Sequence, residues 1–354
     1  MKRILAINPG STSTKVALYA DKEVIFVETI DHPMDELKKY SHVQDQFDFR
    51  KEVIIDLLTK NDITLESLDA VVGRGGLLPP VKSGAYMVNE LMIDRLKNRP
   101  VAEHASNLGA LISYEIAQSV GIDAYIYDSI AVDELSDVAR VSGLPELPRI
   151  SLTHTLNARA TAHKVAEKHG KKYEDMKLIV AHLGGGISVS VHDRGRMIDT
   201  NTDEEGPFSP ERAGRVPCGS LVDLCYSGEY DHRSMRKKLR GNGGLKAYLG
   251  IVDARAVESL IAEGNEEAAV IYEAMAYQVA KAIGELATVL CGEVDAIVLT
   301  GGIAYSKKIT DWITERVKFI APVEIFAGEN ELESLAFGTL RVLNGEEEAR
   351  EYTE

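Results

Sequence analysis

The sequence predicts an α/β protein built from two similar domains that flank a central cleft. Three observations support this fold class. The chain has 354 residues, more than one hydrophobic core usually organises. A strand pattern, a glycine-rich turn and a second strand pattern occur twice, at 4–19 and at 178–191. Each of these hairpins is followed by alternating helix and strand patterns, which are typical of α/β layers.

The first hairpin, ILAINPGSTSTKVALY, carries a turn rich in groups that bind anions. Glycine lets backbone N–H groups approach an anion closely, Ser11 and Ser13 add short hydroxyl donors, and Lys15 adds a positive charge. The turn is therefore interpreted as a phosphate-binding turn, with a plain polar hairpin turn as the alternative. It is not a Walker loop, because no Gly-x4-Gly-Lys-Ser/Thr string occurs in the chain.

The second hairpin, LIVAHLGGGISVSV, repeats the first at a distance of about half the chain. Aligning the two turns places His182 on Asn8, 174 residues later, as a duplicated domain would. His182 begins a turn that suits a phosphate, and a core histidine bonded to backbone is the alternative. The glycines of this turn are Gly184, Gly185 and Gly186.

The remaining patterns extend both halves in the same order. Apolar runs predict strands and 3.6-residue periodicity predicts helices. Residues 328–334 are expected to start a helix that carries the chain to its end, and the acidic segment 345–354 is read as a solvated helix end. The expected strands are 24–29, 68–72, 124–127 and 296–300, and the expected helices are 49–60, 107–119 and 266–290.

Polar residues follow the predicted strands of the first half, where α/β sheets present functional groups. Arg74 leaves a strand that is apolar through Val72, and Asp128 closes the strand 124–127. His104 and Asn107 fall at the start of a helix, whose free N–H groups favour an anion. The alternatives are a surface arginine, a capping carboxylate and plain helix capping.

The second half offers three further candidates. The loop 203–217 is long, contains three prolines and presents Arg212 and Arg215; long ordered loops in compact domains are usually functional. The turn at Gly301 and Gly302 could lie against the sugar or phosphate of a nucleotide. Glu331 is a candidate for a water-mediated magnesium contact, or it complements a helix dipole.

Composition excludes several classes of protein. The formal net charge of −15 argues against binding of nucleic acid, which depends on clustered Lys and Arg. The apolar run at the N-terminus is too short for the core of a signal peptide, and no apolar run in the chain approaches the length of a membrane span. Cys218, Cys225 and Cys291 are scattered, so buried free thiols in a cytoplasmic protein are expected.

Taken together, these motifs resemble the acetate kinase family, in the superfamily of actin, heat-shock ATPases and sugar kinases. The resemblance covers nearly the whole chain. It is carried, in family order, by NPGSTSTK, GRGG, EHASNLGA, YDS, HLGGGIS, EGPFSPERAGRVP, LTGGIA and GENELESLAFG. It implies two actin-like, ribonuclease H-like domains, 1–148 with 330–354 and 149–329, and reversible phosphoryl transfer between ATP and a short carboxylic acid.

The chain departs from acetate kinases at HASNLG and at GPFSPERAG, which favours butyrate over acetate as the acid. Isobutyrate, propionate and acetate stay open, as does an actin-like ATPase without an acyl substrate. The family also implies Mg²⁺, a cytoplasmic location and a homodimer or higher homo-oligomer. Partners other than the carboxylate or its acyl phosphate, such as nucleic acid or a membrane, are not expected.

The resemblance also implies residue roles. The catalytic residues would be Arg74, Asp128, His182 and Arg215. The carboxylate and phosphoryl group would be bound by Arg74, His104, Asn107 and Arg215. The magnesium residues would be Asn8, Asp128 and Glu331, with Glu333 as the alternative to Glu331. The nucleotide would be lined by Ser11, Ser13, Lys15, Gly184, Gly185, Gly186, Gly301 and Gly302.

Overall fold

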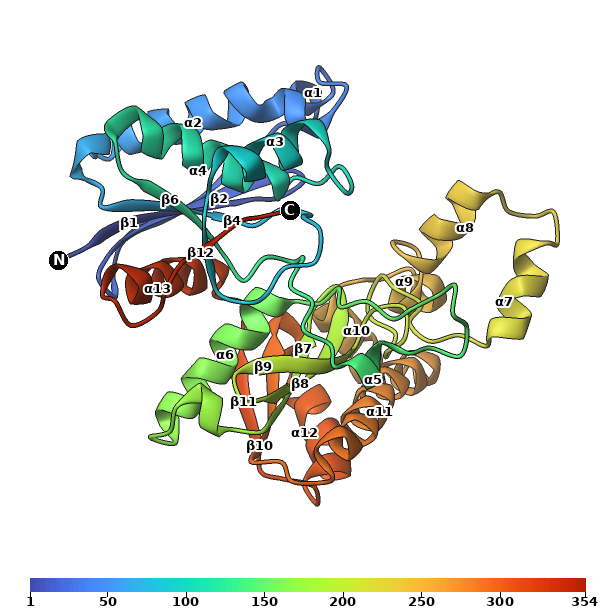
Figure 1. Cartoon of the computed structure of the whole chain (residues 1–354). Helices are drawn as coiled ribbons and strands as arrows, with labels where there is room; N and C mark the ends of the chain where they lie inside the picture. The colour runs from blue at the N-terminus through green and yellow to red at the C-terminus, as the bar shows by residue number, and fades with distance from the viewer. The chain divides into compact units, whose positions relative to one another are not determined.

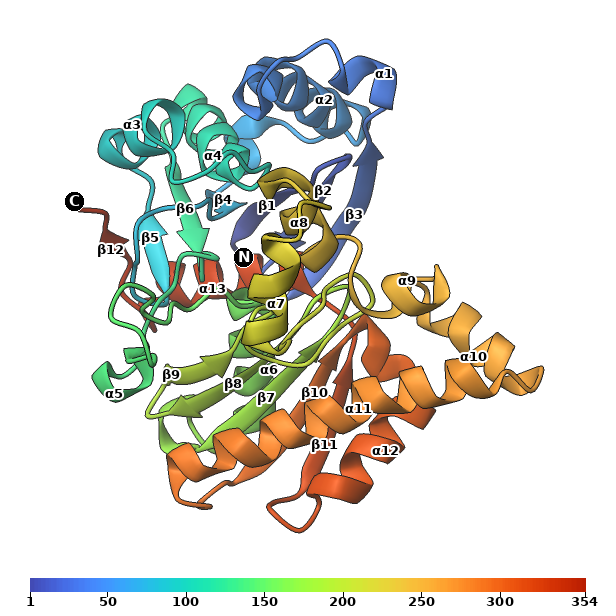
Figure 2. The same cartoon turned by 90° about the vertical axis from the view of Figure 1, so that its right-hand side faces the viewer.

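The structure, a computed structural model, describes residues 1–354 and contains two compact units (Figure 1). Unit 1 consists of Met1–Asp133 and Asn330–Glu354, and unit 2 of Glu134–Glu329. The expected domain limit at 329/330 coincides with a limit of the units, the expected limit at 148/149 lies 15 residues after the unit limit at 133/134, and the domain assignment stays a prediction. Each unit is built on one β-sheet with helices on both faces (Figures 1 and 2).

Unit 1 holds a seven-stranded sheet in the order β12-β5-β6-β4-β1-β2-β3. Strands β1, β2 and β3 form an antiparallel meander, whereas β1, β4 and β6 run parallel. Central strands covered on both faces need continuous apolar runs, and residues 4–7 of β1 are fully buried. The strands are β1 Arg3–Pro9, β2 Ser13–Ala20, β3 Glu23–Asp31, β4 Ala70–Arg74, β5 Ala85–Met87, β6 Asp123–Tyr127 and β12 Arg350–Glu351.

Helices α2, α3 and α4 cover one face of this sheet, and α13 covers the other (Figure 1). Helix α4 packs directly on β4 and β6 and ends at Gly121, whose left-handed φ of 72° closes the helix. The helices of unit 1 are α1 Met34–Leu37, α2 Phe47–Lys60, α3 Glu90–Asn98, α4 Asn107–Val120 and α13 Glu331–Leu343.

Unit 2 repeats the same core. Its sheet has the order β11-β10-β7-β8-β9, with an antiparallel meander β7-β8-β9 and parallel neighbours β7, β10 and β11. This is the arrangement of β6, β4, β1, β2 and β3 in unit 1, so the predicted duplication is confirmed. The strands are β7 Leu178–Leu183, β8 Ile187–Asp193, β9 Arg196–Asn201, β10 Ala296–Gly301 and β11 Val323–Ala327.

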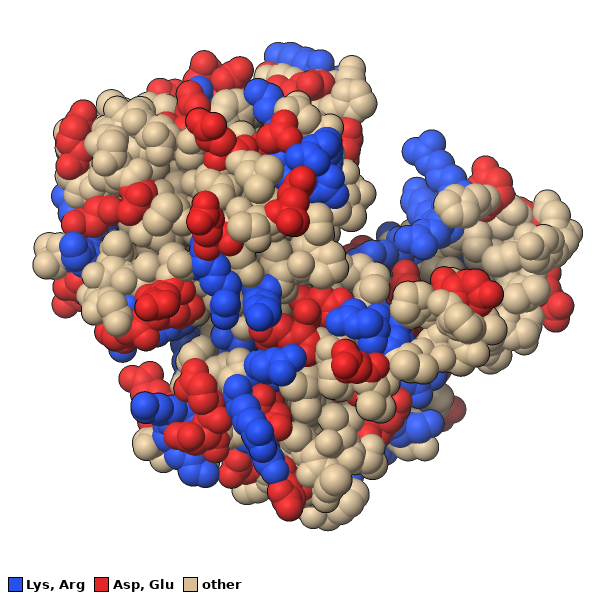
Figure 3. Space-filling model, in the orientation of Figure 1, with Lys and Arg blue, Asp and Glu red and all other residues tan.

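Helix α6 lies on one face of this second sheet, and α11 and α12 lie on the other (Figure 2). Helices α7 and α8 project from the body of the unit, and basic side chains gather over α8 (Figures 1 and 3). None of the residues of α7 is buried. The helices are α5 Asp137–Arg140, α6 Thr155–Lys168, α7 Cys218–Cys225, α8 His232–Leu239, α9 Gly244–Leu249, α10 Ala254–Ala262, α11 Glu266–Ala287 and α12 Lys307–Val317.

Three expectations about local structure are wrong. The last helix, α13, does not reach the end of the chain but stops at Leu343. The acidic end is not a solvated helix end, because β12 pairs with β5 and Tyr352 is only 3% exposed. The cysteines are free, as expected, but all three are exposed and not buried.

None of the helices is long and apolar enough to cross a membrane.

Candidate active site

In unit 1, three predicted residues share one edge of the sheet. Asn8, Arg74 and Asp128 lie at or just after the carboxyl ends of the parallel neighbours β1, β4 and β6. The register pairs Ile7 with Gly73 and Arg74 with Tyr127, so the three strands end at the same level. This edge is where parallel α/β sheets bind ligands.

An ion pair links this edge to the start of α13. Nη1 of Arg74 lies 3.0 Å from Oε1 of Glu331, and Asn8 donates from Nδ2 to the other carboxylate oxygen. Arg74 and Glu331 are both largely shielded, with side chains 26% and 17% exposed. Glu333 instead acts on Tyr19, whose pKa is raised to about 12 mainly by burial and also by this carboxylate. Of the two glutamates, Glu331 is therefore the one that contacts Arg74 and Asn8.

Two glycines fix the position of Arg74. A Cβ at Gly73 would lie 2.2 Å from the carbonyl oxygen of Gly109, and a Cβ at Gly109 would lie 2.4 Å from the carbonyl oxygen of Arg74. Helix α4 can approach β4 this closely only because neither residue has a side chain.

The side chain of Asn107 accepts from the N–H of Leu77 at 2.8 Å and donates to the carbonyl of Ala102 at 2.9 Å. Asn107 thus holds the segment after Arg74, and its contact with substrate stays a prediction.

Asp128 adopts a left-handed backbone conformation with φ 41°, which is uncommon outside glycine. Its Oδ1 accepts from the N–H of Gly84 at 2.8 Å, while its own N–H donates to the carbonyl of Gly84 at 3.2 Å. These two bonds support the strained residue. Strain that the surroundings maintain at the end of a strand is a feature of functional sites.

The remaining candidates of unit 1 lie in loops or at the start of β2. His104 is exposed, and its Nδ1 lies 2.7 Å from the hydroxyl of Ser106. The turn between β1 and β2 is closed by a hydrogen bond from the N–H of Gly10 to the carbonyl of Ser13. Ser11 in this turn and Lys15 on β2 are exposed, and Ser13 is half-buried. The turn thus presents the hydroxyl and ammonium groups that the sequence suggested.

In unit 2, the candidate residues lie at the equivalent edge. His182 and the glycine turn follow β7, and Gly301 ends the parallel neighbour β10. Gly301 has φ 89°, and a Cβ there would lie 2.4 Å from the carbonyl oxygen of Leu183. It exchanges two backbone hydrogen bonds with Gly328, of 3.2 and 3.0 Å. The space beside Gly302 is open, so a ligand can approach the backbone there.

His182 is 2% exposed and lies between two fixed oxygens. Its Nδ1 is 3.2 Å from Oδ1 of Asn157, and its Nε2 is 3.1 Å from Oε1 of Glu329. Because Thr300 donates to Oδ1 of Asn157, this oxygen is an acceptor, and the proton of His182 is assigned to Nδ1. Nε2 faces the carboxylate oxygen of Glu329, and it can donate to that oxygen only when both ring nitrogens carry a proton.

A second histidine, which the sequence did not single out, belongs to this site. The rings of His154 and His182 stack with centroids 3.8 Å apart and planes 10° from parallel. Nδ1 of His154 lies 3.0 Å from the hydroxyl of Ser188. His154 precedes α6 in a stretch without glycine, so no turn signal marked it. The pairing of Thr300 with His182 in the register of β10 and β7 places these groups at the same sheet edge.

Arg212 lies against the glycine turn. A Cβ at Gly186 would lie 2.6 Å from Nη1 of Arg212, so the guanidinium occupies the space that glycine leaves. The same Nη1 forms an ion pair of 2.7 Å with Asp203, which also pairs with Arg240 at 3.0 Å. Ser209 ties the loop to the turn by donating to the carbonyl of Gly185 at 2.7 Å.

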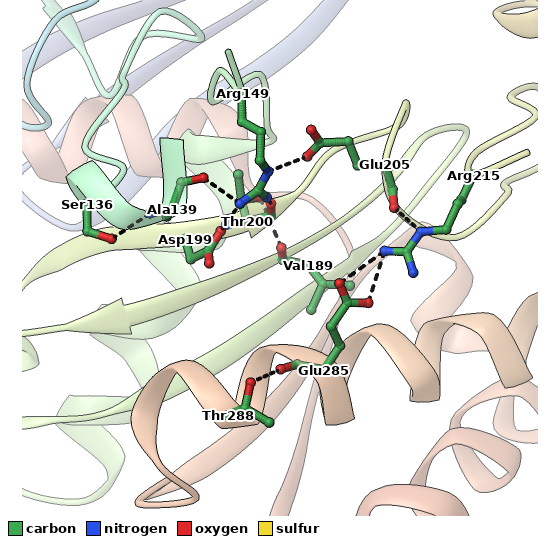
Figure 4. A network of polar contacts seen from close by, with 10 residues as sticks. All are labelled: Ser136, Ala139, Arg149, Val189, Asp199, Thr200, Glu205, Arg215, Glu285 and Thr288. Atoms are coloured by element: carbon green, nitrogen blue, oxygen red, sulfur yellow. Dashed lines mark hydrogen bonds and ion pairs between the residues drawn. The ribbon is translucent and has the colours of Figure 1, made fainter. Parts of the chain in front are cut away.

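Arg215, three residues further on, lies in a different environment (Figure 4). Its Nη2 forms an ion pair of 2.9 Å with Glu285 on α11, and its Nε donates to the carbonyl of Glu205 at 2.7 Å. Both side chains are about half exposed, at 54% and 50%. They line a pocket of about 520 Å³, which Arg149 and Asp199 also line.

The structure therefore assembles two groups of predicted residues, one in each unit. Asn8, Arg74 and Glu331 contact one another in unit 1, and Asp128 shares their sheet edge. In unit 2, His182, Gly186 and Gly301 lie at the ends of neighbouring strands, and Arg215 is bonded elsewhere. No group of three or more His, Cys, Asp or Glu side chains is arranged to hold a metal ion by itself.

Comparison with known proteins explains this duplicated arrangement. The structure superposes on acetate kinase from Porphyromonas gingivalis with a TM-score of 0.82 and 19% identity, covering 97% of this chain and 100% of that one. Acetate kinase from Entamoeba histolytica gives a TM-score of 0.77 and 18% identity, covering 96% and 99% of the two chains. The predicted actin-like fold of two α/β domains is thus confirmed, and the cleft between the domains stays a prediction.

The sequence relatives define the class of protein as ATP-dependent phosphotransferases that use a carboxyl group as acceptor. Residues 153–336 match the profile of the Acetokinase family. Butyrate kinase 1 of Clostridium acetobutylicum is 52% identical over 99% of this chain and 100% of its own length. Butyrate kinase 2 of the same organism is 50% identical over 99% of both chains. The chain belongs to the acetokinase family.

Proposed function

We propose that this chain catalyses the reversible transfer of the γ-phosphoryl group of ATP to butyrate, which yields butyryl phosphate and ADP in the cytoplasm. The observation that carries the proposal is the 52% identity, over essentially the full length of both chains, to a protein named butyrate kinase. The residues at the two sheet edges support the same chemistry. The family reaction transfers a phosphoryl group to a short carboxylic acid, and the proposal specifies butyrate as that acid.

The reaction needs cations more than it needs a base. A carboxylate is ionised at neutral pH, so one of its oxygens bonds to the γ-phosphorus while the bond from that phosphorus to the bridging oxygen breaks. ADP leaves with the electron pair, and no proton has to move. Because two anions meet, most of the catalysis comes from positive groups and N–H donors around the transferred phosphoryl group.

In unit 1, we assign Arg74 to the carboxylate and the phosphoryl group. Its guanidinium now holds the carboxylate of Glu331, which marks a position suited to a carboxylate or a phosphoryl oxygen. His104 and Asn107, predicted beside the substrate, remain part of the proposal as groups near this edge. The β1–β2 turn with Ser11 and Lys15 is proposed to bind phosphate oxygens.

In unit 2, we assign His182 to the phosphoryl group through Nε2, which lies 3.1 Å from the carboxylate of Glu329 and donates to an anionic oxygen when both ring nitrogens carry a proton. His154 supports the ring of His182 by stacking. The guanidinium of Arg212 places a positive charge beside Gly186, the last glycine of this turn. The family resemblance implies that Arg215 binds the carboxylate and the phosphoryl group, and Arg215 remains the alternative to Arg212 for this role.

Magnesium would complement these groups by neutralising the phosphates. Mg²⁺ usually keeps several waters and takes one or two protein carboxylates besides the phosphates of the nucleotide. Asp128 and Glu331, with the amide of Asn8, supply that kind of oxygen set at one sheet edge. The nucleotide itself is proposed to lie along Gly184, Gly185, Gly186, Gly301 and Gly302.

A homodimer or larger homo-oligomer is part of the proposal, and it rests on the family resemblance. Helix α7 offers a surface for such a contact, because none of its residues is buried within the chain. Size-exclusion chromatography with light scattering checks the oligomeric state.

The proposed reaction is tested by trapping the product. The purified chain is incubated with ATP, Mg²⁺ and hydroxylamine and with each acid from two to five carbons, straight and branched, and acyl hydroxamate is measured. We expect the highest kcat/KM with butyrate, although one methylene in an apolar pocket is worth only about 1–3 kcal/mol. A higher kcat/KM with acetate, propionate or isobutyrate than with butyrate would make that acid the proposed substrate. ATP hydrolysis without any hydroxamate would favour an actin-like ATPase.

A further inference from the structure

A fully buried arginine lies behind the turn between β1 and β2. Arg50, on α2, has no exposed surface. No carboxylate lies within ion-pair distance of it, so its charge is not neutralised by an acidic partner. Burial lowers the pKa of Arg50 to about 10, which leaves the guanidinium charged at neutral pH. A buried cation without a counter-ion is costly, and native proteins rarely keep one without a reason.

The guanidinium is instead saturated by oxygens of the turn. Its Nη1 donates to the carbonyls of Gly10 and Ser13, at 2.8 and 3.2 Å, and its Nη2 donates to the carbonyl of Ser11 at 3.1 Å. Gln46, one helical turn earlier, accepts from Nε and Nη2 at 3.0 and 2.8 Å and so orients the planar group. The carbonyl of Thr12 accepts instead from the N–H of His32, the residue after β3, at 2.8 Å.

These contacts determine where the N–H groups of the turn point. In a trans peptide, the N–H of one residue points opposite to the carbonyl of the residue before it. Because the carbonyls of Gly10 and Ser11 face the buried guanidinium, the N–H groups of Ser11 and Thr12 face the other way. The N–H groups of Ser11 and Thr12 have no acceptor within the protein. Consecutive outward N–H groups of this kind form an anion-binding concavity.

The charge of Arg50 also acts on its surroundings. The pKa of His32 is lowered to about 4, first by burial and then by Arg50, so His32 is neutral at pH 7. Its Nε2 lies 2.8 Å from the hydroxyl of Thr14, which also accepts from Arg50 at 3.2 Å. His32 thus adds no positive charge behind the turn, where the guanidinium of Arg50 is buried and the carboxylate of Asp31 also acts on His32.

We propose that Arg50 is a positioning residue for phosphoryl transfer: it draws the carbonyls of the β1–β2 turn inward, so that the N–H groups and hydroxyls face the phosphates of ATP, and it adds positive charge behind them. This rests on the proposed function, because it takes the turn to be the site of the nucleotide's terminal phosphates. Arg50 does not touch the substrate. Its role cannot be taken over by lysine, which lacks the planar fork that bonds three carbonyls at once.

The experiment compares variants of two buried arginines in the full chain. Arg50→Met removes the guanidinium behind the turn. Arg159→Met is the matched control, because Arg159 in unit 2 is 6% exposed and donates to a backbone carbonyl, that of Gly195, at 2.8 Å. Both variants are expected to lower the urea midpoint of unfolding. Only Arg50→Met should weaken the binding of the β,γ-imido analogue of ATP, measured by titration calorimetry with Mg²⁺.

We expect at least about tenfold weaker binding of the analogue to Arg50→Met, and binding to Arg159→Met within about twofold of the parent chain. The KM for butyrate should change less than about twofold in Arg50→Met, since the acid is bound elsewhere. Affinity for the analogue equal to that of the parent chain would overturn the proposal. An equal loss in both variants would also overturn it, because the effect would then be one of general stability.

Arg50→Lys keeps the proposal testable if Arg50→Met does not fold. The lysine retains the positive charge but lacks the planar guanidinium that bonds several carbonyls. We therefore expect an intermediate affinity for the ATP analogue, at least about threefold below that of the parent chain. Full affinity in Arg50→Lys would overturn the positioning role. The analogue binds without any acyl acceptor. A parent chain that binds it and forms no butyryl hydroxamate would therefore contradict the proposed function while leaving the role of Arg50 standing.

Discussion

Arg212 and Arg215 are three residues apart in one loop, and their side chains have different partners. Arg212 fills the space beside Gly186, whereas Arg215 pairs with Glu285 on α11. A cation in direct contact with the transferred phosphoryl group stabilises it most, because the Coulomb attraction falls with distance and salt screens exposed charges beyond about 8–10 Å. At the scale of single residues, the geometry therefore separates two arginines that the sequence presents together.

We predict that Arg212→Ala lowers kcat by at least about 100-fold, because arginine stabilisation in phosphoryl transfer is worth about 10³–10⁵ in rate. Arg215→Ala is the matched variant, taken from the same loop, and it should lower kcat less than about fivefold. Single-turnover rates with saturating ATP and butyrate measure both effects. The reverse order, with the large loss in Arg215→Ala, would restore the assignment that the sequence favoured.

At the scale of elements, the contact between β4 and α4 positions Arg74. Gly109→Ala would place a methyl group 2.4 Å from the carbonyl oxygen of Arg74. We predict a loss of about 1–3 kcal/mol in the free energy of unfolding, because overpacking forces the backbone to move. We also predict at least about tenfold lower kcat, since a small misplacement of a catalytic group is costly. Urea unfolding and steady-state kinetics measure the two effects.

The control is Gly284→Ala in α11, where an added Cβ meets no atom within 4 Å. Removing a glycine from a helix interior should there raise stability by about 0.5–1 kcal/mol, with kcat unchanged. If Gly109→Ala behaved like this control, α4 would not be what holds Arg74 in place.

The elements that the sequence predicted well are those defined by local patterns. Both glycine hairpins, the helices that follow them and the groups at the strand ends depend on periodicity and turn chemistry within a few residues. The features that were missed depend on contacts between distant segments. Arg50 bonds a turn about 40 residues away, and β12 buries Tyr352 by pairing with a strand more than 260 residues earlier. Such pairings leave no periodic signal.

At the scale of the whole molecule, each unit contains a buried neutral histidine. His32 in unit 1 and His192 in unit 2 are 4% and 0% exposed. Burial, followed by the charge of Arg159, lowers the pKa of His192 to about 3, and the pKa of His32 is about 4. Both values lie below the ordinary value of 6.5. Each histidine therefore resists protonation in the folded chain and takes up a proton on unfolding.

The hydrogen bonds of His192 explain the resistance. Ser190 donates to the carbonyl of Val180, so its oxygen accepts from Nε2 of His192 at 2.8 Å. Nδ1 is then the acceptor of the Tyr173 hydroxyl, at 2.7 Å, and that hydroxyl in turn accepts from Arg159. A proton on Nδ1 would break this directed chain of hydrogen bonds and add a second buried charge beside Arg159.

The sign of the pH dependence follows from these pKa values. The stabilisation that depends on the two neutral histidines is fully present well above pH 6.5. It is lost as the pH falls from 6.5 toward 4 for His32 and toward 3 for His192, because the unfolded chain binds protons that the folded chain does not bind. Each histidine should contribute a slope of up to about 1.4 kcal/mol per pH unit below pH 6.5. Urea unfolding followed by circular dichroism at pH 7.5, 6.0 and 5.0 measures the slope of the parent chain, to which carboxylates with lowered pKa, such as that of Glu324, add near pH 5. His192→Gln, which can keep both hydrogen bonds without titrating, should lower the slope by up to about 1.4 kcal/mol per pH unit. Equal acid sensitivity in this variant and the parent chain would show that His192 is already protonated in the fold.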